Sequence, residues 1–229
     1  MDGPGAAAFV RAYLRVAPVA HVPEVLLYQA QEPIGLWELT EGEYHTDQPP
    51  PFWAFAWAGG TGLARYLLDH PAEVAGRRVV DLAAGSGLVA IAAVKAGATC
   101  ATAVEIDPLA AAATQLNARE NGVALTVVHD DLLDRGLGDL GIPAADAVVA
   151  AGDVFYSRDM SARILTFLRR AARDGAGVLV GDPGRAYFPG SYFTALCTLD
   201  VPVRPELEST TVRTVTIYRM NPRGAGAQP

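Results

Sequence analysis

The sequence predicts an α/β fold with a mostly parallel sheet of seven strands, an antiparallel hairpin formed by the last two, and a helical extension at the N-terminus. Three observations predict it. Between residues 78 and 180, short β-branched segments alternate with helical ones, which is typical of parallel strands covered by helices on both faces. A glycine-rich turn follows the first of these strands. Two β-branched segments near the C-terminus have no helix between them.

The first 58 residues are expected to form an N-terminal extension and an aromatic segment. Residues 6–16 space their apolar side chains as one face of a helix, and Pro18 and Pro23 end that pattern. Residues 48–57 contain three consecutive prolines followed by Phe-Trp-Ala-Phe-Ala-Trp. These rings would form a large exposed apolar patch unless they pack against something or bind it.

The predicted core covers residues 59–220 of what we expect to be a single domain of 229 residues. Its expected strands are 78–82, 99–106, 124–128, 145–151, 177–180, 198–203 and 211–218, and its expected helices are 60–70, 88–96, 108–120 and 158–173. Residues 221–229 are expected to be a disordered tail.

Composition excludes several classes of function. The net charge of −7 makes nucleic acid a poor partner, and no apolar stretch approaches the roughly 20 residues of a membrane span. The acidic start, with Arg11 and Arg15 soon after it, does not resemble a signal peptide, so a cytoplasmic protein is expected. No metal is expected, because neither the four histidines nor the two cysteines have the spacing of metal ligands. Cys100 and Cys197 are instead expected to be buried thiols.

The turn after the first core strand predicts a nucleoside site. Gly85 and Gly87 allow the backbone to approach a ligand, and Glu105, at the end of the second strand, is placed to accept hydrogen bonds from both ribose hydroxyls. The same residues also satisfy a dinucleotide fingerprint, so a nicotinamide enzyme is an alternative. Asp81 favours a methyl donor, because a carboxylate there attracts the cationic amino-acid end of S-adenosylmethionine and repels a pyrophosphate.

Acidic and aromatic residues follow the next two strands. Asp130 is the candidate for the adenine amino group, whereas the neighbouring Asp131 is equally suited to capping a turn. After the fourth strand, residues 153–156 place an acid, a phenyl ring and a phenol at the carboxyl edge of the sheet, where a substrate is expected to lie.

Asp153 and Tyr156 resemble the D-x-x-Y signature of lysine methyltransferases that modify non-histone proteins. With residues 50–60, 64–69 and 181–185, nearly the whole chain resembles the electron transfer flavoprotein β-subunit lysine methyltransferase family. The resemblance implies a Rossmann-like seven-strand class I methyltransferase fold, S-adenosylmethionine as cofactor, and a lysine of a folded protein as substrate, first of all the flavoprotein β subunit. The alternative substrates are a small-molecule amine or another protein, such as a ribosomal one. A further alternative for the function is a module that binds the donor without turnover.

The resemblance also implies roles for individual residues. Trp53 and Trp57 would lie against the donor, with core packing as the alternative, and Ala83 and Ile106 would join the donor site although relatives often carry glycine in place of Ala83. Asp153 and Tyr156 would be catalytic, with Asp153 orienting the incoming nitrogen rather than acting as a base. Phe155, Asp182 and Arg185 would contact the substrate, although residues 182–185 are equally suited to a simple turn.

Overall fold

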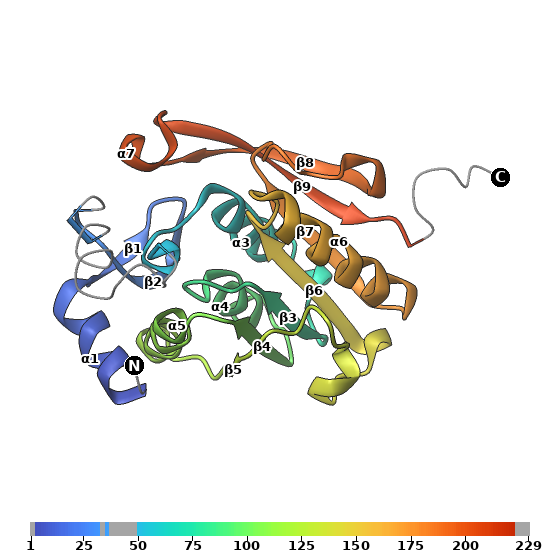
Figure 1. Cartoon of the computed structure of the whole chain (residues 1–229), viewed down its shortest axis with the longest axis horizontal. Helices are drawn as coiled ribbons and strands as arrows, with labels where there is room; N and C mark the ends of the chain where they lie inside the picture. Colours follow the sequence, from blue (N-terminus) through green and yellow to red (C-terminus); the bar gives the residue numbers. More distant parts are fainter. Residues whose placement is uncertain (1–2, 33–34, 37–49, 223–229) are drawn as a thin grey trace.

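The structure is a computed structural model that describes residues 3–32, 35–36 and 50–222. Its centre is a seven-stranded sheet with the order β5-β4-β3-β6-β7-β9-β8 (Figure 1). The strands are β3 (Arg78–Leu82), β4 (Cys100–Glu105), β5 (Thr126–His129), β6 (Ala147–Gly152), β7 (Gly177–Asp182), β8 (Phe193–Pro202) and β9 (Val212–Met220). β3 to β7 are parallel, and β9 runs antiparallel to both of its neighbours, β7 and β8. The predicted fold class is confirmed.

Alternating side chains along the strands build a core on each face of the sheet. On one face, Val79 and its neighbours pack against α3 (Ala58–Asp69) and α4 (Leu88–Lys95). On the other face, Val80 and Leu82 pack with α6 (Arg158–Arg173) and with the segment that contains η3 (Leu137–Leu140) and η4 (Ala144–Asp146). The remaining helices are α5 (Pro108–Glu120), α7 (Pro205–Glu208), η1 (Phe52–Ala54), η2 (Pro71–Glu73) and η5 (Gly190–Tyr192).

The N-terminal extension differs from the prediction. The helix α1 (Gly3–Tyr13) ends before Arg15, and an antiparallel hairpin follows it, formed by β1 (Arg15–Val19) and β2 (Val22–Gln29). The prediction extended the helix to residue 16 and missed the hairpin, because Pro18 suggested a loop. A proline is tolerated here because β1 is an edge strand of a two-stranded sheet.

The extension is anchored to α5, beside which Figure 1 shows α1. Asn117 Oδ1 accepts the backbone N–H of Tyr28 at 2.7 Å. Asn121 accepts from the backbone N–H of Leu26 at 3.0 Å and donates to its carbonyl at 2.6 Å. Two asparagines one helical turn apart therefore hold β2 in a fixed position on the core.

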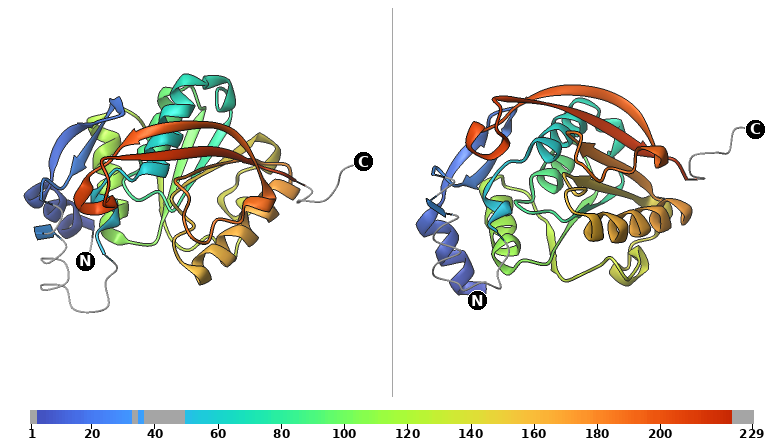
Figure 2. Two further views of the ribbon diagram at one scale, coloured as in Figure 1. Left: turned by 90° about the horizontal axis from the view of Figure 1, so that it is seen from above. Right: turned by 45° about the horizontal axis from the view of Figure 1, so that its top comes forward.

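The C-terminal hairpin is longer than expected. β8 begins at Phe193 rather than at residue 198, and Figure 2 shows the β8–β9 ribbon arching over α3, which both strands contact. Asn221 is bonded to the carbonyl of Tyr192 at 2.9 Å, so the predicted disordered tail does not begin there, and residues 223–229 lie outside the described part. Cys100 and Cys197 are both partly exposed, so the prediction of two buried thiols was wrong. Within the described ranges, no helix is long and apolar enough to cross a membrane.

Candidate functional site

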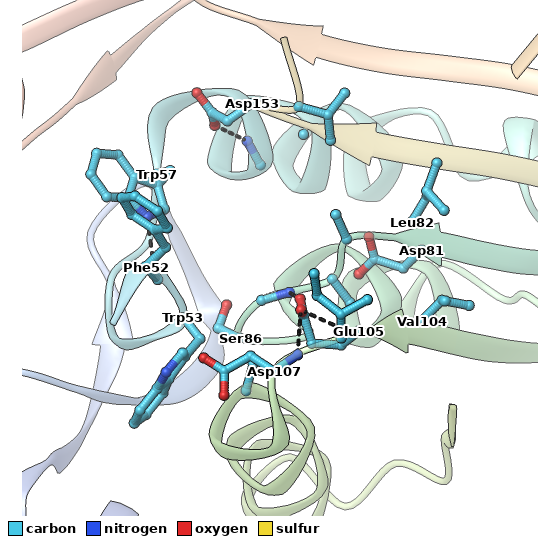
Figure 3. Close-up of a pocket in the computed structure, with 18 of the residues that line it drawn as sticks. Phe52, Trp53, Trp57, Asp81, Leu82, Ser86, Val104, Glu105, Asp107 and Asp153 are labelled. Carbon is cyan, nitrogen blue, oxygen red and sulfur yellow. Dashed lines mark hydrogen bonds between the residues drawn. The ribbon is translucent and has the colours of Figure 1, made fainter. Parts of the chain in front are cut away.

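A cavity of about 420 Å³ opens at the carboxyl ends of β3, β4 and β6. Figure 3 shows its two opposite walls, with the aromatic segment on one side and the ends of β3 and β4 on the other. This volume lies within the range of small-molecule pockets, about 300–1,000 Å³. The predicted site residues that line it are Trp53, Trp57, Asp81, Ala83, Gly85, Glu105, Ile106, Asp130, Asp153, Tyr156 and Arg185.

Asp81 is a buried acid at the end of β3. Its side chain is 2% exposed, and one oxygen accepts the backbone N–H of Ala90 in α4 at 2.9 Å. Burial raises the pKa of Asp81 to about 8, against the lowering effect of the Ala90 N–H group. A cation bound beside it favours the ionised form, so a cationic ligand is expected to bind with proton release below pH 8.

The two glycines of the turn have different structural roles. Gly85 has a φ of +53° and lines the cavity, where its N–H donates to Glu105 Oε2 at 2.8 Å. Gly87 has a φ of +78° but does not line the cavity, and a Cβ there would lie 2.6 Å from Cγ2 of Thr114. The predicted contact between Gly87 and the donor therefore does not fit the structure, in which Gly87 starts α4 and lets α5 approach closely.

Ala83 adopts a left-handed backbone with a φ of +56°. This conformation costs an L-residue about 1–2 kcal/mol, more than the roughly 0.5–1 kcal/mol of chain entropy that glycine loses on folding. We expect Ala83→Gly to leave the free energy of unfolding unchanged or raise it by up to about 1 kcal/mol in urea denaturation. Ala84→Gly, at a negative φ, is the control and should lower it by about 0.5–1 kcal/mol. Equal losses of unfolding free energy in both variants would show that the backbone of Ala83 is not strained.

Glu105 links the glycine turn to the end of β4. Besides Gly85, it accepts the N–H groups of Ile106 at 2.8 Å and Asp107 at 3.1 Å, both on Oε1. Burial raises its pKa even though these three donors lower it. A carboxylate offers about four acceptor positions, so one remains for a ligand hydroxyl on Oε2. The neighbouring Ile106 is 55% exposed and offers an apolar surface at the cavity mouth.

The two aspartates after β5 are already engaged. Asp130 pairs with Arg135 and accepts the N–H of Asp131. Asp131 accepts the N–H of Leu133 at 2.9 Å and pairs with Arg163 at 2.8 Å, which is the turn-capping role considered for it. Both line the cavity, and the adenine contact of Asp130 stays a prediction.

The aromatic segment forms the second wall. Trp53 is 2% exposed and packs in a cluster that also includes α1 and α5 residues, so it serves both the core and the cavity. Trp57 donates its indole N–H to the Phe52 carbonyl at 2.8 Å, which bends the segment around Phe55. Phe52, which the sequence interpretation did not select, lies between Trp57 and Tyr156, with ring centroids 5.8 and 5.9 Å away.

Asp153 lies at the turn after β6 with a left-handed φ of +59°. Oδ2 accepts the N–H of Gly60, in the first turn of α3, at 2.9 Å. Oδ1 accepts from Nη2 and Nε of Arg185 at 2.6 and 3.1 Å, a two-pronged ion pair. Burial raises the pKa of Asp153 to about 6, and Arg185 opposes that rise.

The structure places the other predicted catalytic and substrate-binding residues differently: one lines the cavity and two lie outside it. Tyr156 is 54% exposed at the cavity mouth, and burial raises its pKa. Phe155 is fully buried against Phe188 and Phe193 and does not line the cavity, so its predicted substrate contact does not fit. Asp182 is 1% exposed and also lies outside the lining.

Asp182 instead shapes the loop that carries Arg185. Its Oδ1 accepts the N–H groups of Gly184 and Arg185 at 2.7 and 2.8 Å, which makes residues 182–185 a turn. Contact of Asp182 with the substrate is therefore a prediction that the structure does not support.

The sequence interpretation missed the apolar floor of the cavity. It is formed by Leu132, Leu133, Val154, Met160 and Ile164. Leu132 and Leu133 directly follow the two aspartates, and this position after a strand end was the available signal. The described residues contain no cluster of His, Cys, Asp or Glu able to hold a metal ion.

Residues 61–151 match the family model described as ribosomal protein L11 methyltransferase. The chain is 38% identical over 168 residues to the electron transfer flavoprotein beta subunit lysine methyltransferase of Danio rerio, covering 72% of this chain and 62% of that protein. The relative of the same name from Xenopus laevis is 41% identical over 140 residues, covering 60% of this chain and 54% of that protein. The relative from Homo sapiens is 37% identical over 158 residues, covering 67% of this chain and 56% of that protein. The chain thus spans less than two thirds of the length of these relatives.

Among solved structures, an archaeal protein from Pyrococcus horikoshii, assigned provisionally as an RNA methyltransferase, is similar with a TM-score of 0.54 and 17% identity. The match covers 82% of this chain and 96% of that one, and it supports the fold alone. The resemblance predicted from the sequence is confirmed by the relatives.

Proposed function

The chain has a class I methyltransferase fold and is a relative of the electron transfer flavoprotein β-subunit lysine methyltransferases; from this premise we propose that it is an S-adenosylmethionine-dependent protein-lysine methyltransferase. The flavoprotein β subunit is the first candidate substrate. The observation that carries the proposal is a cavity with a buried acid, Asp81, on one side and Asp153 with Tyr156 at its mouth.

The residues present fit the donor. Asp81 is a buried carboxyl group with one backbone donor and no cationic partner among the described residues, as a site for a cationic amino-acid moiety requires. Glu105 retains an acceptor position, and the aromatic rings and apolar floor suit an adenosine group. A nicotinamide dinucleotide fits less well, because its pyrophosphate would bring negative charge, and no cation, to the buried acids Asp81 and Glu105.

When bound, S-adenosylmethionine would supply a methyl group on a cationic sulfur: the target lysine would first lose a proton to water, its neutral nitrogen would form the new N–C bond, and the electron pair of the broken C–S bond would stay on sulfur, leaving a methylated ammonium. A lysine ammonium has no lone pair, and presenting it as neutral amine at pH 7 costs roughly 4–5 kcal/mol. Tyr156, Phe52 and Trp57 lower that cost by excluding water from the nitrogen. Asp153 accepts an N–H of the amine and orients it.

The test is mass spectrometry of purified electron transfer flavoprotein from the same host, incubated with the enzyme and S-adenosylmethionine. We expect lysine to gain whole methyl groups, and Asp153→Asn to lower the rate by about 100-fold or more because the nitrogen is no longer held in line. Equal rates in both enzymes would contradict the orienting role. No gain on the flavoprotein would move the search to ribosomal proteins, which the match of residues 61–151 favours, and to small amines.

A further inference from the structure

Four charged side chains form a continuous row from the cavity mouth to the β8–β9 hairpin. Arg185 Nη2 lies 2.6 Å from Asp153 Oδ1 and 2.9 Å from Glu208 Oε1. Glu208 Oε2 in turn lies 3.2 Å from Nε of Arg213. The side chains of Asp153 and Glu208 are only 11% and 4% exposed, so water screens these pairs poorly.

Arg185 is held from several directions. Asp182 fixes its backbone through the N–H groups of Gly184 and Arg185, and the Trp57 ring lies 5.8 Å from its guanidinium carbon. Glu208 belongs to α7, which lies between β8 and β9, so this hairpin contributes a side chain that holds the cavity-lining Arg185.

We infer that Arg185 is a positioning residue that neutralises Asp153, that Glu208 holds it there, and that the site therefore accepts the target lysine as a neutral amine. The inference rests on the proposed function and adds the charge state in which the target lysine enters the site. Neither Glu208 nor this role of Arg185 was predicted from the sequence.

The reason is electrostatic. An unpaired carboxylate beside the target nitrogen would stabilise the ammonium, the form that cannot react. The Asp153–Arg185 ion pair as a whole carries no net charge, yet Asp153 keeps acceptor capacity, because Oδ1 takes two N–H groups of Arg185 and Oδ2 only that of Gly60. The charged groups facing Arg185 are Asp153, Glu208 and the nearby Asp182. Arg213 balances Glu208, and Asp182 is 1% exposed and lies outside the cavity lining, so an entering ammonium meets Asp153 only as a member of an ion pair.

Removal of the internal cation should therefore change the pH dependence. For Arg185→Gln we expect the pH of half-maximal kcat to rise by about one unit, so that kcat at neutral pH falls about ten-fold and recovers near pH 10. At pH values where Asp153 is ionised in the variant, KM for the substrate protein should stay constant or fall, because the unpaired carboxylate binds the ammonium form better. Arg185→Lys, which keeps the charge, should restore most of the profile, and Glu208→Gln should shift it in the same direction as Arg185→Gln but by less. The control is Arg219→Gln, which neutralises an arginine paired with Glu73 and should change nothing.

A second measurement does not depend on turnover. In 13C-labelled protein, the Asp153 carboxyl resonance, assigned by its loss in Asp153→Asn, should titrate near pH 6 in the wild type and at higher pH in Arg185→Gln. An unchanged titration together with an unchanged kcat profile would overturn the inference. If the wild type methylates no protein but the titration shifts, the proposed function fails, while the neutralisation of Asp153 by Arg185 stands.

Discussion

Replacement of Asp81 by asparagine is expected to weaken S-adenosylmethionine binding by about 100-fold while making the ligand-free protein more stable near neutral pH. The affinity falls because the donor's cationic end loses a buried carboxylate, an interaction of about 2–5 kcal/mol. Stability rises because the pKa of Asp81 is about 8 in the folded protein and about 3.9 in the unfolded chain. The folded state thus binds more protons between these values, and wild-type stability falls as the pH rises from about 4 to 8.

Asparagine stays neutral in that window, and its oxygen can still accept the N–H of Ala90. We expect the variant to exceed the wild type at pH 8 by on the order of 2 kcal/mol, after the cost of burying its N–H group. Calorimetric titration and urea denaturation at pH 5 and pH 8 measure both effects. Asp182→Asn changes another buried acid outside the cavity and should leave donor affinity intact; a similar loss there would argue against a specific role for Asp81.

Gly59→Ala should prevent stable folding or lower the free energy of unfolding by about 3 kcal/mol or more. A Cβ at Gly59 would lie 2.3 Å from the carbonyl oxygen of Gly181 and 2.7 Å from Oδ2 of Asp153. Neither has room to move, since that carbonyl accepts the N–H of Asp153 and the carboxylate is held by Arg185. The first turn of α3 therefore contacts the strand ends directly, and any side chain at Gly59 separates them.

Gly60→Ala is the matched control, one residue along the same helix. Its Cβ would meet only Val89 Cγ2 at 4.0 Å, so the variant should be as stable as the wild type or gain up to about 1 kcal/mol from helix propensity. Thermal unfolding of the two variants separates steric contact from general effects of replacing glycine in α3. Equal melting temperatures would show that the contact is not tight.

Much of the fold follows from pattern alone. α5 and α6 have the boundaries that their apolar spacing predicted, residues 108–120 and 158–173, because Pro108 and the residues around Ser157 mark their starts. The β1–β2 hairpin was missed because Pro18 suggested a loop and because β2 is held by Asn117 and Asn121, which lie about 90 residues away in the chain. No local pattern contains such contacts.

The site was predictable where chemistry is local to a strand end. Asp81 and Glu105 lie at the carboxyl ends of the parallel strands β3 and β4, and Asp153 directly follows β6, so the topology brings them to one cavity. The direction of a side chain was not predictable: Phe155 and Tyr156 are adjacent, yet one points into the core and the other to the cavity mouth. The pairing of Arg185 with Glu208 depends on the turn between β8 and β9, whose place relative to β6 only the folded chain sets.

The aromatic wall and the acidic wall of the cavity come from different parts of the chain. Residues 81–89 and 104–107 lie within the region that matches the family model, whereas Phe52, Trp53 and Trp57 precede it. The extension places these rings by packing α1 and β2 on α5. We therefore expect a fragment limited to residues 61–151 to keep Asp81 and Glu105 but to lose the aromatic surface that would enclose a bound methyl donor, so that the smallest donor-binding unit would extend beyond this region on the N-terminal side.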